Sequence, residues 1–166
     1  AGVVSTFLGD GTNGVTGTRV YNPNCIVIKQ DTRYVVWEDK ARYIRWANIE
    51  GTTTTTQIVG KSTEQTTTAD GFGTSVQLTG GFAMVMHTDQ RHVFYMESLD
   101  ILRIVDLHRA FVWRELQRTS LTTWQSGNAD TANVNNLRSA CMRDPGRLYV
   151  VGLNAVGYVD FATTTL

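Results

Sequence analysis

The sequence of 166 residues has little of what identifies a secreted scaffold, a membrane protein or a nucleic-acid binder by composition. It contains 2 prolines and 2 cysteines, Cys25 and Cys141, which are too few for a disulfide framework. We expect both to be free, buried, structural thiols. No run approaches the roughly 18 apolar residues that span a bilayer, so we expect no membrane insertion. The formal net charge is zero, with lysines only at Lys29, Lys40 and Lys61, which argues against a nucleic-acid partner.

The chain also lacks an Asn-x-Ser/Thr sequon, and it starts at Ala1 without a charged-then-apolar leader. These features predict a processed mature protein or an excised fragment. Threonine, in contrast, is abundant and forms runs at Thr52–Thr56, Thr66–Thr68 and Thr163–Thr165. We interpret the runs as β-strand residues on half-exposed surfaces, with O-glycosylated surface stretches as the alternative. They favour an extracellular or cell-surface location over a cytoplasmic one.

Two stretches of the chain repeat each other without a gap: Asn24–Ile49 returns as Phe82–Leu107, and Ala140–Phe161 is a looser third copy. A shift of 58 positions aligns Lys29 with His87, Asp31 with Asp89, Trp37 with Tyr95, Asp39 with Glu97, and Arg45 with Arg103. Since one repeat cannot bury its hydrophobic face alone, the copies must pack on one another.

Short β-branched and aromatic runs separated by turns predict an all-β fold. We expect strands at Val3–Leu8, Cys25–Ile28, Tyr34–Trp37, Arg42–Ile49, Thr54–Val59, Ala83–Met86, Val93–Met96, Ile101–Leu107, Phe111–Leu116, Leu148–Val151 and Gly157–Phe161. The residues from Phe111 to Leu121 also show a helical period, and a helix there is the one alternative.

Several short motifs carry a resemblance to a known family. Asp70–Gly73 reads DGFG, Pro23–Ile28 reads PNCIVI, and Asp144–Val151 reads DPGRLYVV. Leu102–Val105 reads LRIV, and Gly2–Gly9 reads GVVSTFLG. Together they resemble the NHL repeat, in which four antiparallel strands form one blade of a β-propeller. The resemblance implies an all-β chain of three such blades.

The implied organisation is a single propeller segment: a blade-completing strand at residues 1–9, blade 1 at about 15–60, blade 2 at about 74–117 and blade 3 at about 136–166. Three blades are fewer than the four to eight of a closed propeller. We therefore expect a head-to-tail homodimer that closes a six-bladed ring, each N-terminal strand completing the partner's third blade. The alternative is that the chain is part of a longer propeller.

An aromatic residue, an acid and an arginine recur in the first two repeats. They predict either packing between blades, with an arginine–carboxylate bridge, or a recognition surface, since tryptophan and arginine are enriched at binding hot spots. Residues that break the repeat are further candidates. The candidate binding residues are Trp37, Asp39, Arg45, Tyr95, Glu97 and Arg103, together with Trp113 and Trp124 from the less repetitive region.

The sequence offers little for catalysis. His87 and His92 flank a turn that also contains Asp89, but we interpret them as solvated turn residues and expect no metal. There is no G-x-S-x-G motif, so we expect no catalytic residues and no cofactor.

The function we expect is a noncatalytic protein-interaction or adhesion module, with itself and another protein as partners. One alternative is an RNA-binding NHL propeller. Another is an engineered or excised self-assembling half-propeller with no ligand.

Overall fold

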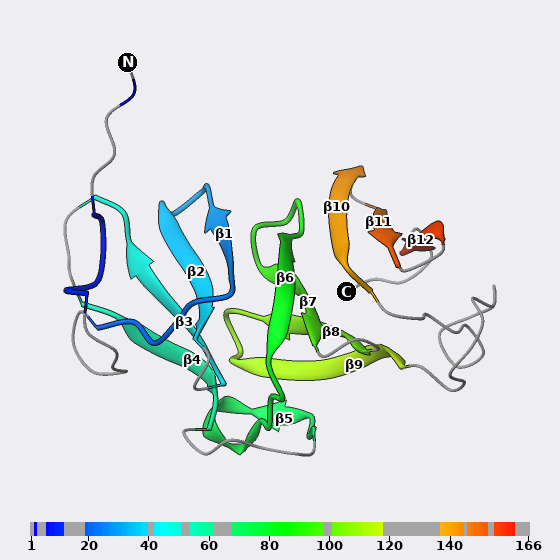
Figure 1. The fold of residues 1–166 in the computed structure, drawn as a ribbon. Coiled ribbons are helices and arrows are strands. Elements are labelled where there is room, and N and C mark those ends of the chain that lie inside the picture. The colour runs from blue at the N-terminus through cyan, green and yellow to red at the C-terminus, as the bar shows by residue number, and fades with distance from the viewer. Residues whose placement is uncertain are drawn as a thin grey trace.

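The computed structural model describes a chain of three antiparallel β-sheets that lie side by side in chain order (Figure 1). We call them blades 1, 2 and 3. The leading face of a blade points toward the preceding blade in the chain, and its trailing face points away from it. The described residues are 2, 6–11, 19–39, 42–50, 54–61, 68–97, 101–117, 137–144, 146–152 and 155–161.

Blade 1 is a four-stranded sheet whose strand order follows the chain. Its strands are β1 (Cys25–Lys29), β2 (Tyr34–Asp39), β3 (Tyr43–Asn48) and β4 (Thr56–Gly60). The register places Ile26 opposite Trp37 and Ile28 opposite Val35. Opposite residues of an antiparallel pair lie on the same side of a sheet, so these four side chains share one face.

Blade 2 repeats this plan with β6 (Gly81–Met86), β7 (His92–Glu97), β8 (Ile101–Asp106) and β9 (Phe111–Gln117). The two-residue strand β5 (Gly71–Phe72) pairs with β9, so this sheet has five strands instead of the expected four. One turn of 3₁₀-helix, η1 (Gly73–Ser75), follows β5. The strand prediction at Phe111–Leu116 is confirmed over the helical alternative.

Blade 3 contains three strands in the described part of the chain: β10 (Ser139–Asp144), β11 (Arg147–Val151) and β12 (Val156–Asp160). The predicted strand at Val3–Leu8 is wrong for Thr6–Leu8, because these residues lie in no sheet and Leu8 instead packs on blade 1. Residues 3–5 lie outside the described residues.

The expected all-β class is confirmed. Wherever residues are described, η1 is the only helix, and none there is long and apolar enough to cross a membrane.

Hydrophobic clusters between neighbouring blades form the core. Between blades 1 and 2, the buried side chains are Cys25, Val36, Ile44, Ile58, Val59, Val76, Leu78, Met84, Val93, Tyr95, Val105, Leu107 and Val112. Between blades 2 and 3 they are Phe94, Met96, Leu102, Ile104, Leu137, Leu148, Val150 and Phe161. Fully burying one aliphatic or Phe side chain contributes about 1.5–3 kcal/mol, so each blade depends on its neighbour for most of its stability.

The two cysteines are both free, but only Cys25 is buried. The expected burial is wrong for Cys141, because its strand β10 belongs to the last blade and Cys141 lies on the exposed side of that strand. Burial, with the nearby Glu38, raises the pKa of the Cys25 thiol to about 12. Cys25 therefore stays protonated and packs as a small hydrophobic residue.

Candidate functional site: buried ion pairs and open blade faces

A buried arginine–carboxylate pair lies at the same place in blades 1 and 2. In blade 2, Arg103 Nη1 donates to Glu97 Oε2 at 2.8 Å. In blade 1, Arg45 Nη1 donates to Asp39 Oδ2 at 2.8 Å, and the indole nitrogen of Trp37 donates to Asp39 Oδ1 at 2.9 Å. The strand pairing brings each set together, because β2 and β3, or β7 and β8, are adjacent strands.

In blade 2 this pair also fixes residues 77–80, which enter the blade just before β6 and which we call the blade 2 strap. Arg103 Nη1 donates to the carbonyl oxygen of Gln77 at 2.9 Å. The backbone N–H and the hydroxyl of Thr79 both donate to Glu97 Oε1, the hydroxyl at 3.2 Å. The charged side chains thus satisfy backbone groups of the strap, where the only bridge pairing described is that of Gln77 with Ala69.

Blade 1 has the same arrangement 58 residues earlier, with residues 19–24 as its strap. Arg45 Nη1 donates to the carbonyl oxygen of Arg19 at 3.0 Å. The backbone N–H of Tyr21 donates to Asp39 Oδ1 at 3.2 Å. The repeated acid and arginine therefore act together as a clamp on each strap, and in blade 1 Trp37 also donates to the acid.

The burial of these residues favours the packing interpretation over exposed recognition. The following are no more than 3% exposed: Trp37, Asp39, Arg45, Tyr95, Glu97 and Arg103. Trp113 is half-buried on β9, with its ring centroid 5.9 Å from that of His92. Trp124 lies outside the described residues.

Tyr95 imposes a close approach on the first residue of β6. A Cβ atom at Gly81 would overlap the Tyr95 ring, which is fully buried between blades 1 and 2. We expect Gly81→Ala to lower the free energy of unfolding by about 1–3 kcal/mol, as overpacking does in other cores. Urea unfolding of this variant beside Gly2→Ala would test it, because Gly2 has open space around its Cα and is not among the glycines with a positive φ. An unchanged Gly81→Ala midpoint would contradict this packing.

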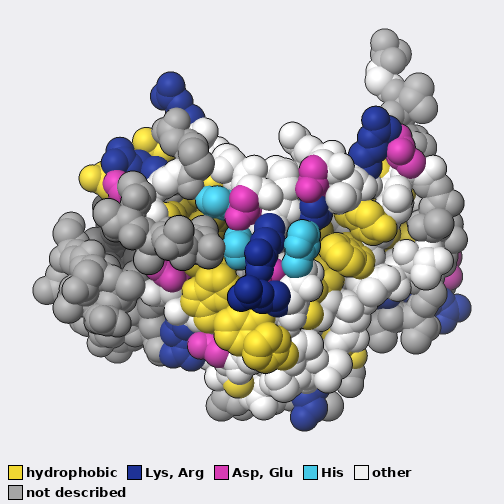
Figure 2. Space-filling view, turned by 180° about the vertical axis from the view of Figure 1, so that it is seen from behind, with side chains coloured by type: hydrophobic (Ala, Val, Ile, Leu, Met, Phe, Trp, Pro, Cys, Tyr) yellow, Lys and Arg dark blue, Asp and Glu magenta, His cyan; other side chains and the backbone are white. Residues whose placement is uncertain are grey.

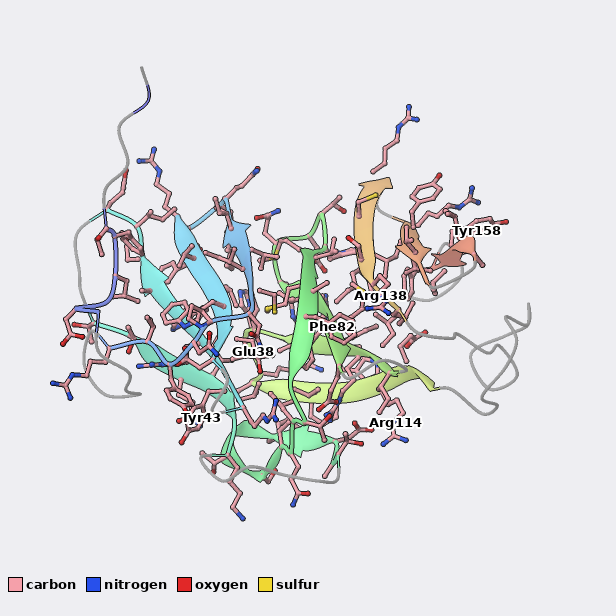
Figure 3. All side chains as sticks on the ribbon, viewed as in Figure 1. Glu38, Tyr43, Phe82, Arg114, Arg138 and Tyr158 are labelled. Atoms are coloured by element: carbon pink, nitrogen blue, oxygen red, sulfur yellow. The ribbon has the colours of Figure 1, made fainter. Side chains whose placement is uncertain are left out.

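Glu38 is an interface residue that the sequence reasoning did not select. Its side chain is fully buried between blades 1 and 2 (Figure 3) and accepts a hydrogen bond from Asn24 Nδ2 at 3.2 Å. Burial raises the pKa of its carboxyl group to about 7, against hydrogen bonds from Asn24 and the Gly81 amide that lower it. The 58-residue shift aligns Glu38 with Met96. An acidic residue at a position that is apolar in the other repeat was the feature of the sequence that could have identified Glu38.

The leading face of blade 1 is apolar and open. Ile26 and Ile28 are 64% and 53% exposed there, beside Val35 and Trp37. A groove of about 340 Å³ runs along this face, and the residues lining it include Phe7, Leu8, Val20 and Pro23. At the equivalent places of blade 2, Met84, Met86, Val93 and Tyr95 pack in the cluster between blades 1 and 2.

The trailing face of blade 3 is the second open face. Val151, Val156 and Tyr158 are 40%, 76% and 58% exposed, whereas the alternate residues Leu148 and Val150 face blade 2. Tyr158 lies at the end of the molecule away from blade 1 (Figure 3). Blades 1 and 2 bury their own trailing faces against the next blade, so the two end faces of the chain remain open.

Comparison with known proteins supports this fold. No protein-family model and no curated protein sequence matches the chain. Among solved structures, a chain of the nidogen/laminin complex aligns with a TM-score of 0.58 and 16% identity, over 89% of this chain and 48% of its own length. A structural genomics protein of unknown function from Bacteroides thetaiotaomicron aligns with a TM-score of 0.50 and 12% identity, over 77% and 44%.

The fold is therefore propeller-like, and the likeness concerns the fold alone. The chain spans less than half the length of both of these structures.

Proposed function

We propose that the chain is a noncatalytic protein-interaction module of NHL-like propeller blades, and that its open end faces bind a second copy of the chain head to tail. The observation that carries the proposal is the pair of exposed apolar faces at the two ends of the three blades. The presence of a chain from a protein–protein complex among the similar folds also supports protein binding as the class of function.

The internal repetition indicates that a second copy of the chain covers the two open end faces. The leading faces of blades 2 and 3 are covered by the trailing faces of blades 1 and 2. A second copy presents the same kind of trailing face to blade 1, and its leading face to blade 3. Such a heterologous contact closes a ring when the rotation returns on itself. Two copies also match the length of the similar structures, of which one copy covers 44–48%.

The outer edge of blade 3 has room for one more strand. In the described part of the chain β12 pairs only with β11, whereas blades 1 and 2 continue to a fourth strand. Exposed sheet edges invite pairing with another chain. A strand from the partner copy would complete this blade in the ring.

The test is the mass in solution, by light scattering or sedimentation over a range of concentrations. We expect twice the 18.4 kDa of one chain. Ile26→Asp and Tyr158→Asp should each weaken dimerisation at least about tenfold, because each buries a charge in an apolar contact. Phe72→Asp is the matched control, since Phe72 is 61% exposed but lies at the outer edge of blade 2.

Mixing the two monomeric variants identifies the geometry. In a head-to-tail dimer, Ile26→Asp and Tyr158→Asp chains together retain one intact interface, so the mixture should form heterodimers. A monomeric wild-type chain at every concentration would refute the proposal. Dissociation by Phe72→Asp to the same extent would also count against it.

A further inference from the structure

Two histidines and an aspartate converge on the turn between β6 and β7. His87 Nδ1 lies 3.0 Å from Asp89 Oδ1, and His92 Nδ1 lies 2.6 Å from Asp89 Oδ2. One ligand atom from each residue lies within 4.8 Å of the others. Both imidazoles are buried, so the expectation of solvated turn residues is wrong for them, while the Asp89 side chain is about one-third exposed.

The equivalent turn of blade 1, between β1 and β2, has different residues at the two histidine positions. There Lys29 replaces His87 and Asp31 replaces Asp89, and the buried Lys29 ammonium forms an ion pair with the Asp31 carboxylate. Blade 1 thus supplies its own cation to this turn. Blade 2 has two imidazoles beside its carboxylate instead, because His92 replaces Tyr34. Nitrogen and oxygen donors of this kind are ligands for a metal cation.

The cluster is held in place by its surroundings. The backbone N–H groups of Arg91 and His92 donate to Asp89 Oδ1 at 2.8 and 3.0 Å. Burial opposes ionisation of Asp89, but these bonds and those from the two imidazoles keep its pKa well below the usual range. On the far side of the His92 ring, Nε2 lies 3.9 Å from the Asp106 carboxylate, which Arg91 holds.

We propose that His87 Nδ1, His92 Nδ1 and the Asp89 carboxylate bind one divalent transition-metal ion of the zinc class. Three protein ligands leave a fourth position for water or for a group from a partner. Binding places the ring proton of each histidine on Nε2, so that the His92 N–H faces Asp106, a carboxylate–histidine–metal arrangement. Figure 2 shows histidine side chains beside acidic and basic ones on this side of the molecule.

The experiment titrates the untagged chain with Co²⁺ and then with Zn²⁺. We expect one equivalent of Co²⁺ to bind with the visible absorption of a low-coordinate site, and Zn²⁺ to displace it. The bound Co²⁺ should also quench Trp113, whose ring centroid lies 5.9 Å from that of His92. Trp113→Phe should keep the absorption and lose this part of the quenching.

His87→Lys is the decisive variant. It replaces a metal ligand with the residue that blade 1 has at the equivalent position, where the buried Lys29 forms an ion pair with Asp31. It should weaken Zn²⁺ binding by more than about 100-fold, beyond the usual effect of removing a group that only supports a ligand. His108→Ala is the matched control, since His108 is exposed and outside the cluster, and it should leave the affinity unchanged. No stoichiometric binding, or equal binding by folded His87→Lys, would overturn the proposal.

Discussion

Arg103→Ala is expected to lower the free energy of unfolding by about 3–5 kcal/mol, the cost of breaking a buried ion pair by removing one partner. Besides Glu97, the Arg103 Nη2 group donates to the carbonyl oxygen of Ala69 at 2.6 Å and to Asp70 Oδ1 at 2.8 Å. The substitution therefore removes the cationic partner of the fully buried Glu97 carboxylate, together with a donor to each of the carbonyl oxygens of Gln77 and Ala69. Urea unfolding at fixed protein concentration measures the effect.

Two further variants separate the ion pair from simple loss of volume. Arg103→Lys keeps the charge but loses the planar fork, so we expect an intermediate loss. Arg109→Ala removes an arginine that is 72% exposed and 3.8 Å from Asp106, and it should change stability by no more than about 0.5 kcal/mol. If Arg103→Ala unfolds at the same urea concentration as Arg109→Ala, the clamp is not a source of stability.

The wild-type chain is expected to lose stability as the pH rises from 5 to 7, and Glu38→Gln is expected to remove most of this loss. The folded-state pKa of Glu38 is raised from 4.5 to about 7, so the folded chain binds a proton that the unfolded chain has released in this range. Stability is therefore full below about pH 4.5 and falls as the pH rises to about 7. A shift of this size corresponds to a loss on the order of 3 kcal/mol.

The measurement is the free energy of unfolding at a series of pH values, for wild type and Glu38→Gln. The two should agree near pH 4, and the variant should be more stable at pH 8. Glu50→Gln is the control, because Glu50 is exposed and pairs only with Arg33 in the described structure. A slope that persists in Glu38→Gln would place its origin elsewhere.

The repeat and its strands could be predicted from the sequence because hairpin strands pair with near neighbours. Val, Ile and aromatic residues at Cys25–Ile28 and Val93–Met96 mark strands that the structure contains within one or two residues. The fifth strand, β5, could not be predicted, since two residues show no periodicity and pair with residues of β9 that are far away in the sequence.

The candidate residues were found by the same repetition, but their surroundings were not. Arg103 and Glu97 recur in the sequence, whereas the strap atoms that they bind belong to positions with no pattern of their own. The burial of His87 and the exposure of Cys141 depend on which blade faces have a neighbour. That information is long-range, and a local pattern does not contain it.

The clamp on each strap has a consequence for synthesis on the ribosome. The carbonyl oxygen of Gln77 precedes its partner Arg103 by 26 residues, and Arg19 precedes Arg45 by the same interval. The arginine contact of a strap therefore forms only when the third strand of its own blade has left the ribosome. The contacts that fix each strap are thus local in sequence, which favours rapid folding, whereas most of the stability of a blade is gained only when its neighbour covers it.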